Sequence, residues 1–227
     1  MKNLNLFILL FALLTLSCSK NDRNDLPQST CDFIDFKYYN GAEYYLGELS
    51  NDYILIGIDT SYSDSDIRNF ISNIIHFDQS YDYIIHITSQ YKFKEIPVKF
   101  KSSKSCEEIT QIISELEQNA IISYAHYTMQ TDDCNNLIDE LMGNKCINSY
   151  GSSFHVKVFD ADDLTDLNQM IIQTNTELVK QNEFMKNWFE LSATKRSNGD
   201  ALKMANFFCE SGLFAYSEPG ISKYPVE

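Results

Sequence analysis

The chain has 227 residues, with 32 acidic and 18 basic side chains and a formal net charge of −14. Hydrophobic residues make up 44% and aromatic residues 13% of it, which is enough to build a core and excludes wholesale disorder. The acidic excess argues against a nucleic-acid binder, because phosphate contacts need clustered Lys and Arg. The low numbers of glycines (8) and prolines (4) disfavour glycine-loop nucleotide enzymes and collagen-like chains.

The N-terminus has the features of an export signal. A short basic start at residues 1–3 precedes an almost wholly apolar stretch at 4–16, which is too short to span a bilayer and is typical of a secretory signal. It ends in Leu16-Ser17-Cys18-Ser19, which resembles a bacterial lipoprotein box. The resemblance implies cleavage after residue 17 and lipidation of Cys18, so that acyl chains hold the protein at the membrane. The alternative is an ordinary signal peptide (residues 1–17) with a chance cysteine.

The residues after Cys18 indicate where the protein is sorted. Ser19, in place of Asp, resembles outer-membrane sorting in a Gram-negative cell, so we expect an outer-membrane lipoprotein of the cell envelope. Residues 18–35 are expected to form a polar tether. The charged composition of its first part, residues 19–25, is seen in some surface-exported lipoproteins, so the protein is expected to face either the periplasm or the outside.

Five cysteines besides Cys18 remain, an odd set for an oxidising compartment. Cys134 and Cys146 bracket a short polar segment and are the best candidates for a disulfide. Cys209 lies among apolar residues of an expected helix, which favours a buried thiol. No CxxC pair is present, so the sequence does not support a zinc or redox site.

The body of the chain begins with an expected hairpin. Asn40-Gly41 is a strong two-residue turn signal between strand-like residues 36–39 and 44–46. Then residues 53–59 alternate as a strand, and capping boxes that begin at Ser63 and Ser105 precede apolar stripes at helical spacing. With further strands expected at 81–88, 95–101 and 120–129, the order is βαββαβ.

The same order recurs roughly 90–100 residues later. Strands are expected at 153–159, 177–183, 187–194 and 213–218, with helices capped by residues 160–163 and by a box at residues 197–200. Each copy alone would form a split-βαβ sandwich of four antiparallel strands and two helices. The predicted fold class is therefore α+β, with two tandem ferredoxin-like modules at residues 36–130, including the leading hairpin, and 153–219. A linker at 131–152 joins them, and a tail occupies 220–227.

Residue patterns that would indicate catalysis are mostly missing. The histidines have no spacing that suits metal ligation, which favours structural roles for His76, His86, His126 and His155. Four acids are dense enough to suggest calcium, but the glycine that an EF-hand needs is missing and helix starts favour acids, so we prefer capping for Asp160, Asp162, Asp163 and Asp166. Without a G-x-S-x-G motif or an indicated cleft, we expect no enzyme activity, no metal and no cofactor.

The second copy carries a resemblance to a known family. Residues 189–192 match a strand run, residues 199–212 match a "GxAxxxAxxxxExG" helix, and residues 215–219 match a closing strand reading "hxYAEPD". This series resembles the N-terminal pro-region of secreted bacterial subtilases, the subtilisin-like serine proteases. The likeness is strong in the last forty or so residues and thin in the first copy. Gly220 departs from the usual Asp, and the family's catalytic Asp, His and Ser motifs are missing from the sequence.

The resemblance implies a function. In the family the sheet of the pro-region packs on the protease, and its C-terminal tail lies in the cleft as a substrate-like strand. We therefore expect a lipid-anchored, stand-alone propeptide-like protein that inhibits a separately encoded secreted protease or assists its folding. The expected contacts come from the last four residues, with Tyr224 as an aromatic anchor, unless they form a frayed terminus: Tyr224, Pro225, Val226 and Glu227. The alternatives are a non-catalytic surface-binding or structural lipoprotein and the remnant of a split subtilase gene.

Overall fold

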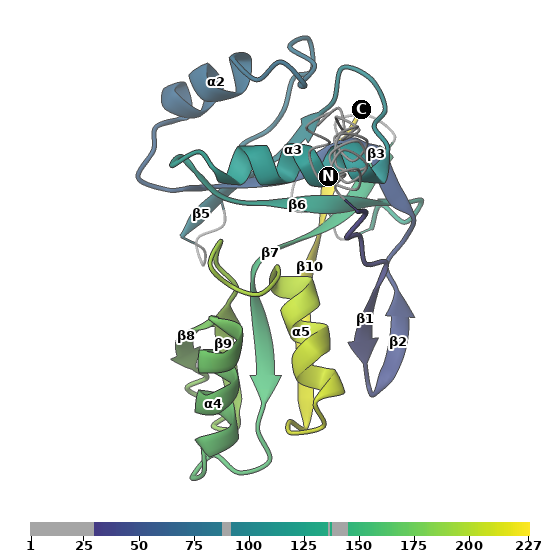
Figure 1. Cartoon of the computed structure of the whole chain (residues 1–227). Coiled ribbons are helices and arrows are strands. Elements are labelled where there is room, and N and C mark those ends of the chain that lie inside the picture. The colour runs from purple at the N-terminus through teal and green to yellow at the C-terminus, as the bar shows by residue number, and fades with distance from the viewer. Residues whose placement is uncertain (1–29, 88–91, 136, 138–144) are drawn as a thin grey trace, which may run out of the picture.

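The computed structural model describes residues 30–87, 92–135, 137 and 145–227 (Figure 1). The fold is mixed α+β with mostly antiparallel strands, which confirms the coarse class predicted from the sequence. Residues 88–91, 136 and 138–144, and the signal with most of the tether, lie outside the described residues. None of the helices in the described ranges is both long and apolar enough to cross a bilayer.

The predicted hairpin is present at the N-terminal end of the described chain. Strands β1 (Phe36–Tyr39) and β2 (Ala42–Tyr45) pair around Asn40 and Gly41, both of which have positive φ. Asn and Gly tolerate that conformation, so the turn forms where the dipeptide stands. The hairpin lies beside the second half of the fold, where the amide of Asn206 donates to the carbonyl of Phe36 (Figure 1).

The first half of the fold follows the predicted order of elements. It comprises β3 (Leu49–Asp59), α2 (Asp64–Ser72), β4 (His86–Ile87), β5 (Phe93–Lys99), α3 (Cys106–Glu117) and β6 (Ile122–Thr131). Both capping boxes are confirmed, because Ser63 and Ser105 accept from backbone N–H groups at Asp66 and Glu108 while those acids bind back. The predicted strand at 81–88 is reduced to two residues.

The second half repeats the order with different helix starts. It comprises β7 (Lys145–Lys157), α4 (Thr165–Thr174), β8 (Glu177–Gln181), β9 (Trp188–Ser192), α5 (Ala201–Glu210) and β10 (Tyr216–Val226). The predicted cap at Asp160 is wrong, since that carboxylate binds the N–H of Asp162 in the loop and α4 starts five residues later, without a side-chain cap. Asp200, not Ser197, caps α5.

One sheet runs through both halves. Its order is β4-β5-β3-β6-β7-β9-β8, and β10 pairs with the other edge of β7. The halves join where β6 pairs with β7 over Met129 to Thr131. Helices cover one face only, so that two apolar clusters form: Ile54, Ile56 and Ile58 lie in the cluster that includes α2 and α3, and Phe154 and Val156 in the one that includes α4 and α5.

Two segments differ from the predicted domain boundaries. Most of the expected linker's second half, from residue 145, is the start of β7, and the expected tail is the second part of β10. The end of the expected tether is bound to the fold as well. Cys31 forms a disulfide with Cys106, and Phe33 packs against both helix-side clusters. These residues pack because an apolar ring and a cysteine interrupt the polar stretch.

Candidate functional site

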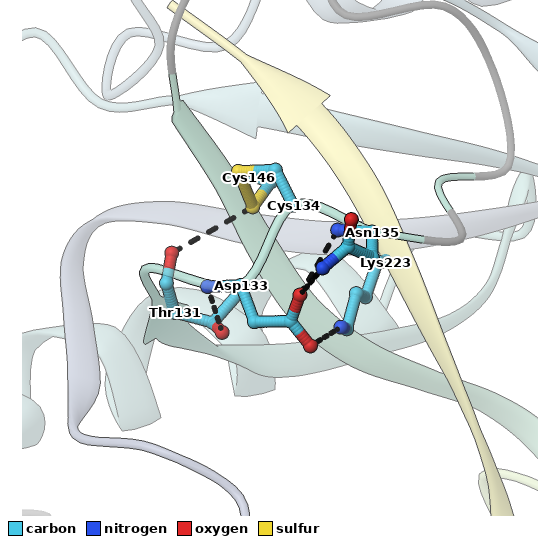
Figure 2. Close-up of a disulfide and its surroundings, with 6 residues drawn as sticks. All are labelled: Thr131, Asp133, Cys134, Asn135, Cys146 and Lys223. Atoms are coloured by element: carbon cyan, nitrogen blue, oxygen red, sulfur yellow. Dashed lines mark hydrogen bonds and ion pairs between the residues drawn. A yellow bond between two sulfur atoms is a disulfide. The ribbon is translucent and has the colours of Figure 1, made fainter.

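The cysteines singled out in the sequence have three different outcomes. Cys18, the expected lipidation site, lies outside the described residues. Cys134 and Cys146 form a disulfide with an S–S length of 2.09 Å, the pairing that their spacing favoured (Figure 2). Cys209 is a half-exposed free thiol rather than a buried one, and burial and the neighbouring Glu210 raise its pKa.

The disulfide lies beside the C-terminal strand. Asp133, next to Cys134, accepts from the ammonium of Lys223 on β10 and from the amide of Asn135 (Figure 2). These hydrogen bonds, that from Lys223 foremost, lower the pKa of the Asp133 carboxyl. The disulfide joins the segment after β6 to β7, and the ion pair joins the same segment to β10.

The last residues of the chain do not form a free tail. Residues 221–226 pair with residues 145–150 of β7, after a register shift between Pro219 and Ile221. Tyr224 and Val226 are fully buried against Tyr53, Leu55 and Ile147. The alternation of β10 thus turns Tyr224 and Val226 toward the face of the first half that the helices leave uncovered. The expectation of a separate tail at 220–227 is therefore wrong, whereas the protease contact expected for residues 224–227 stays a prediction.

A buried carboxylate anchors this C-terminal segment. Glu95 on β5 is 5% exposed and accepts from the hydroxyls of Tyr124 (2.7 Å) and Tyr224 (2.6 Å). Each carboxylate oxygen takes one phenol, and charge-assisted bonds of this kind are stronger than neutral ones. Glu95 was not among the residues singled out in the sequence. The available signal was Gly57, a glycine inside a strand, which often marks a close approach by another group.

The four histidines lie apart from one another. His76 approaches Glu115 at 3.8 Å, and the buried His86 packs edge-on against Tyr224. The ring of His126 is stacked between Tyr124 and Tyr150, whereas His155 is exposed on β7. No group of three or more His, Cys, Asp or Glu side chains among the described residues is arranged to hold a metal ion.

The second half of the sheet has a face that carries no helix, which we call the open face. It consists of the side chains that alternate with the buried ones on β7, β9 and β10: His155, Lys157, Trp188, Glu190, Tyr216 and Glu218. In Figure 1, α4 and α5 lie together on the opposite side of these strands. The open face therefore presents aromatic rings and charges of both signs.

Contacts within the open face hold its side chains in place. The rings of Trp188 and Tyr216 meet edge to face with centroids 5.5 Å apart, and the ammonium of Lys157 lies 5.9 Å from the Trp188 ring. Tyr216 donates to Glu218 at 3.0 Å, and Lys37 of the hairpin pairs with the same carboxylate. Partial burial, reinforced by Glu218, raises the pKa of Tyr216 to about 12. The face is therefore preorganised.

An apolar end adjoins the open face. Phe159 and Phe184 are 70% and 93% exposed, and Met185 is also exposed. Asn187 donates to the carbonyl of Phe159 and so binds the loop after β7 to the start of β9, and Trp188 donates its N–H to the carbonyl of Met185 within the turn between β8 and β9. Exposed rings that lie next to half-buried ones are typical of protein-binding surfaces. Comparison with protein-family models and with curated proteins finds no match to this chain.

Proposed function

We propose that this chain is a non-catalytic, lipid-anchored envelope protein that binds a partner protein on the open face of its second half. Following the resemblance of residues 181–219, we propose a secreted subtilisin-like protease as the partner, which the chain inhibits or helps to fold. The observation that carries the proposal is the open face itself, where Trp188 and Tyr216 stand preorganised on a sheet surface that no helix covers. Trp and Tyr are the residue types most often found at the centres of interfaces.

The strand order supports the finer part of the fold proposal. In each half, the fourth strand in the sequence pairs with the first, and the third lies between the first and the second. The two strand orders are β6-β3-β5-β4 and β10-β7-β9-β8. That is the order of a split-βαβ, ferredoxin-like module with its helices on one face. We therefore propose two such modules in tandem, merged into one sheet. In the family that the chain resembles, it is this sheet surface that packs on the protease.

The proposed mode of binding differs from tail insertion. Tyr224 would have to leave a buried site and its hydrogen bond to Glu95 before it reached a protease cleft. Removing one of the two hydrogen bonds of the buried Glu95 carboxylate costs free energy. The C-terminal segment is therefore a poor substrate mimic. Docking through the open face requires no such rearrangement, and the ion pairs at its margin, Lys180 with Glu190 and Lys37 with Glu218, leave the centre to aromatic contacts.

The anchor and the fold would keep the partner near the membrane. The chain is fixed to the fold from Cys31 onward by the disulfide to Cys106. Residues 18–30 can span at most about 47 Å when fully extended. If Cys18 is lipidated as proposed, Cys31 stays within that distance of the bilayer, and the tethering raises the local concentration of the open face for an envelope-bound or secreted partner.

The test is inhibition of secreted subtilases encoded in the same genome, measured with the processed chain and its variants. Trp188→Ala should weaken inhibition or binding at least tenfold, because truncating a central interface tryptophan removes a large contact area. Ile172→Ala is the matched control, since Ile172 is 77% exposed on α4, on the helix side of the sheet. It should leave binding unchanged.

Two results would contradict this proposal in different ways. If none of the subtilases is bound or slowed, the partner assignment fails, and a different surface-binding or structural role is favoured. If a subtilase is inhibited but Trp188→Ala inhibits as well as the unaltered chain, then the open face is not the contact surface. Deletion of residues 220–227 cannot serve as the test, because it also removes Tyr224 and Val226 from the core.

A further inference from the structure

A cavity of about 220 Å³ lies where the two halves of the fold meet. Its walls come from α3, from β6, from residues 193–200 before α5, and from Asp32 of the N-terminal segment. It shares no residue with the open face.

His126 is a buried polar group of the cavity whose ring is held on both sides. It is 3% exposed, and its ring is held between the rings of Tyr124 and Tyr150, with centroids 4.7 Å and 4.6 Å away. Nδ1 lies 2.8 Å from the carbonyl oxygen of Tyr150. Because a carbonyl only accepts, Nδ1 carries the hydrogen and Nε2 is an acceptor in the neutral ring. Within the part of the chain that the structure describes, Nε2 has no hydrogen-bond or ion-pair partner.

The charged groups around the cavity are mostly acceptors. Glu117 receives one bond, from the N–H of Ala125, and Asp200 receives the hydroxyl of Tyr150 and the N–H of Lys203. The ammonium that lines the cavity, that of Lys195, donates to the carbonyls of Glu117 and Asn119 at 2.8 Å each. Lys195 is therefore engaged at the C-terminus of α3, and the space is left with unfilled acceptor positions.

Burial makes the negative charge in this space costly. It raises the pKa of the Glu117 carboxyl, an effect that the nearby His126 and Lys195 only partly oppose. A cation placed between Glu117, Asp200 and Nε2 of His126 would relieve that cost. A metal ion is not suited, because no three such side chains among the described residues converge closely enough to hold one. An ammonium cation needs a less compact set of acceptors, because its N–H groups hold oxygen and nitrogen acceptors further away than metal–ligand bonds do.

We propose that this cavity binds an alkylammonium group, with Nε2 of His126, Glu117 and Asp200 as its acceptors. An ammonium offers three N–H donors and no acceptor, which complements a lining that is rich in acceptors. The group can come from a free amine or from a lysine side chain of another protein. The proposal stands whether or not the open face binds a protease, since the two surfaces have no residue in common.

The probes are 1,4-diaminobutane for a free amine and Nα-acetyl-lysine-N-methylamide for a lysine side chain. Binding to the processed chain is measured by calorimetry at pH 8, where free imidazoles are neutral. The ¹⁵N shift of Nε2 in His126 is followed in parallel. We expect saturable binding of at least one probe, with a shift at Nε2, and no binding of the uncharged analogue 1,4-butanediol. Binding of the diamine alone indicates a free amine, and binding of the lysine derivative indicates a protein ligand.

Variants separate the cavity from general charge attraction. Glu117→Gln keeps an oxygen that can accept from Ala125 and removes the buried charge, so the fold should remain intact while affinity falls at least tenfold. Glu115→Gln removes the same charge from the same helix at an exposed position and should change affinity less than twofold. Equal losses in both variants, binding of the diol, or no shift at Nε2 with either probe at millimolar concentration would overturn the proposal.

Discussion

At the scale of single residues, the missing side chain of Gly57 makes room for the buried ring of Tyr124. A Cβ atom at Gly57 would lie 2.1 Å from Cζ of Tyr124, so the ring occupies the space above the glycine. That position lets the hydroxyl reach Glu95 and lets the ring stack on His126. The C-terminal anchor and the junction cavity therefore share one determinant.

Replacing Gly57 tests this determinant. Gly57→Ala should lower the free energy of unfolding by about 1–3 kcal/mol, the usual cost of an added methyl group in a packed site. Gly220→Ala is the control, because a Cβ there meets nothing within 4 Å and its effect should stay within about 0.5 kcal/mol. Urea denaturation followed by circular dichroism measures both. Equal stability of the two variants would show that Tyr124 does not need its present position.

At the scale of elements, hydrogen bonds at the helix starts tie stability to pH. Glu108 accepts from the N–H of Ser105 at 2.8 Å, and this bond is the main cause of its lowered pKa. The folded state therefore binds fewer protons than the unfolded chain in the acidic range. The contribution of Glu108 is complete above its unfolded pKa, near 4.5, and is lost as the pH falls through the folded pKa.

The variant Glu108→Gln should therefore be less stable than the unaltered chain at pH 7. The difference should shrink as the pH falls below 4.5 and through the lowered pKa of the folded carboxyl, because the carboxyl of the unaltered chain then becomes protonated as well. Glu183→Gln serves as a charge-matched control, because Glu183 is exposed in the turn between β8 and β9. Thermal unfolding across a pH series measures the effect. A difference that stays constant from pH 7 to pH 3 would contradict the role of this carboxylate.

At the scale of the whole molecule, the C-terminal segment closes the first half of the fold. Tyr224 and Val226 complete a cluster on the face of the first half that its helices leave uncovered, and Tyr53 donates to the carbonyl of Glu227 at 2.6 Å. The disulfide of Cys31 with Cys106 also crosses 75 residues of sequence. Closing a loop of that length lowers the conformational entropy of the unfolded chain, which stabilises the folded state by about 4 kcal/mol relative to it. The C-terminal segment and this disulfide each join parts of the chain that are distant in the sequence.

Removal of residues 221–227 should thus destabilise a region far from them in the sequence. The two buried side chains alone are worth roughly 3–6 kcal/mol, so the truncated chain should unfold at much lower urea concentration and expose the first half to amide exchange. Lys223→Ala, which loses only a surface ion pair with Asp133, should cost less than about 1 kcal/mol. A truncated chain as stable as the full one would contradict the closing role of β10.

The predictions that succeeded depend on neighbours in the sequence. The capping boxes at Ser63 and Ser105, the turn at Asn40-Gly41 and the pairing of Cys134 with Cys146 involve residues at most twelve positions apart. Where several local partners competed, the prediction failed. Asp160 satisfied a loop N–H instead of capping α4, and Ser197 accepted from Thr194 while Asp200 capped α5.

The order of strands and helices in each half was predictable from local patterns, because periodicity, turns and caps act over a few residues. Local patterns could not predict which segment packs on the face of the first half that its helices leave open. Tyr224 donates to Glu95, which lies 129 positions away in the sequence. An alternating strand pattern predicts that one face of the strand is buried, but it does not predict which segment buries it. The burial of residues 224 and 226, the cavity between the halves and the open face all follow from that long-range choice, which is decided by the packing of the complete chain.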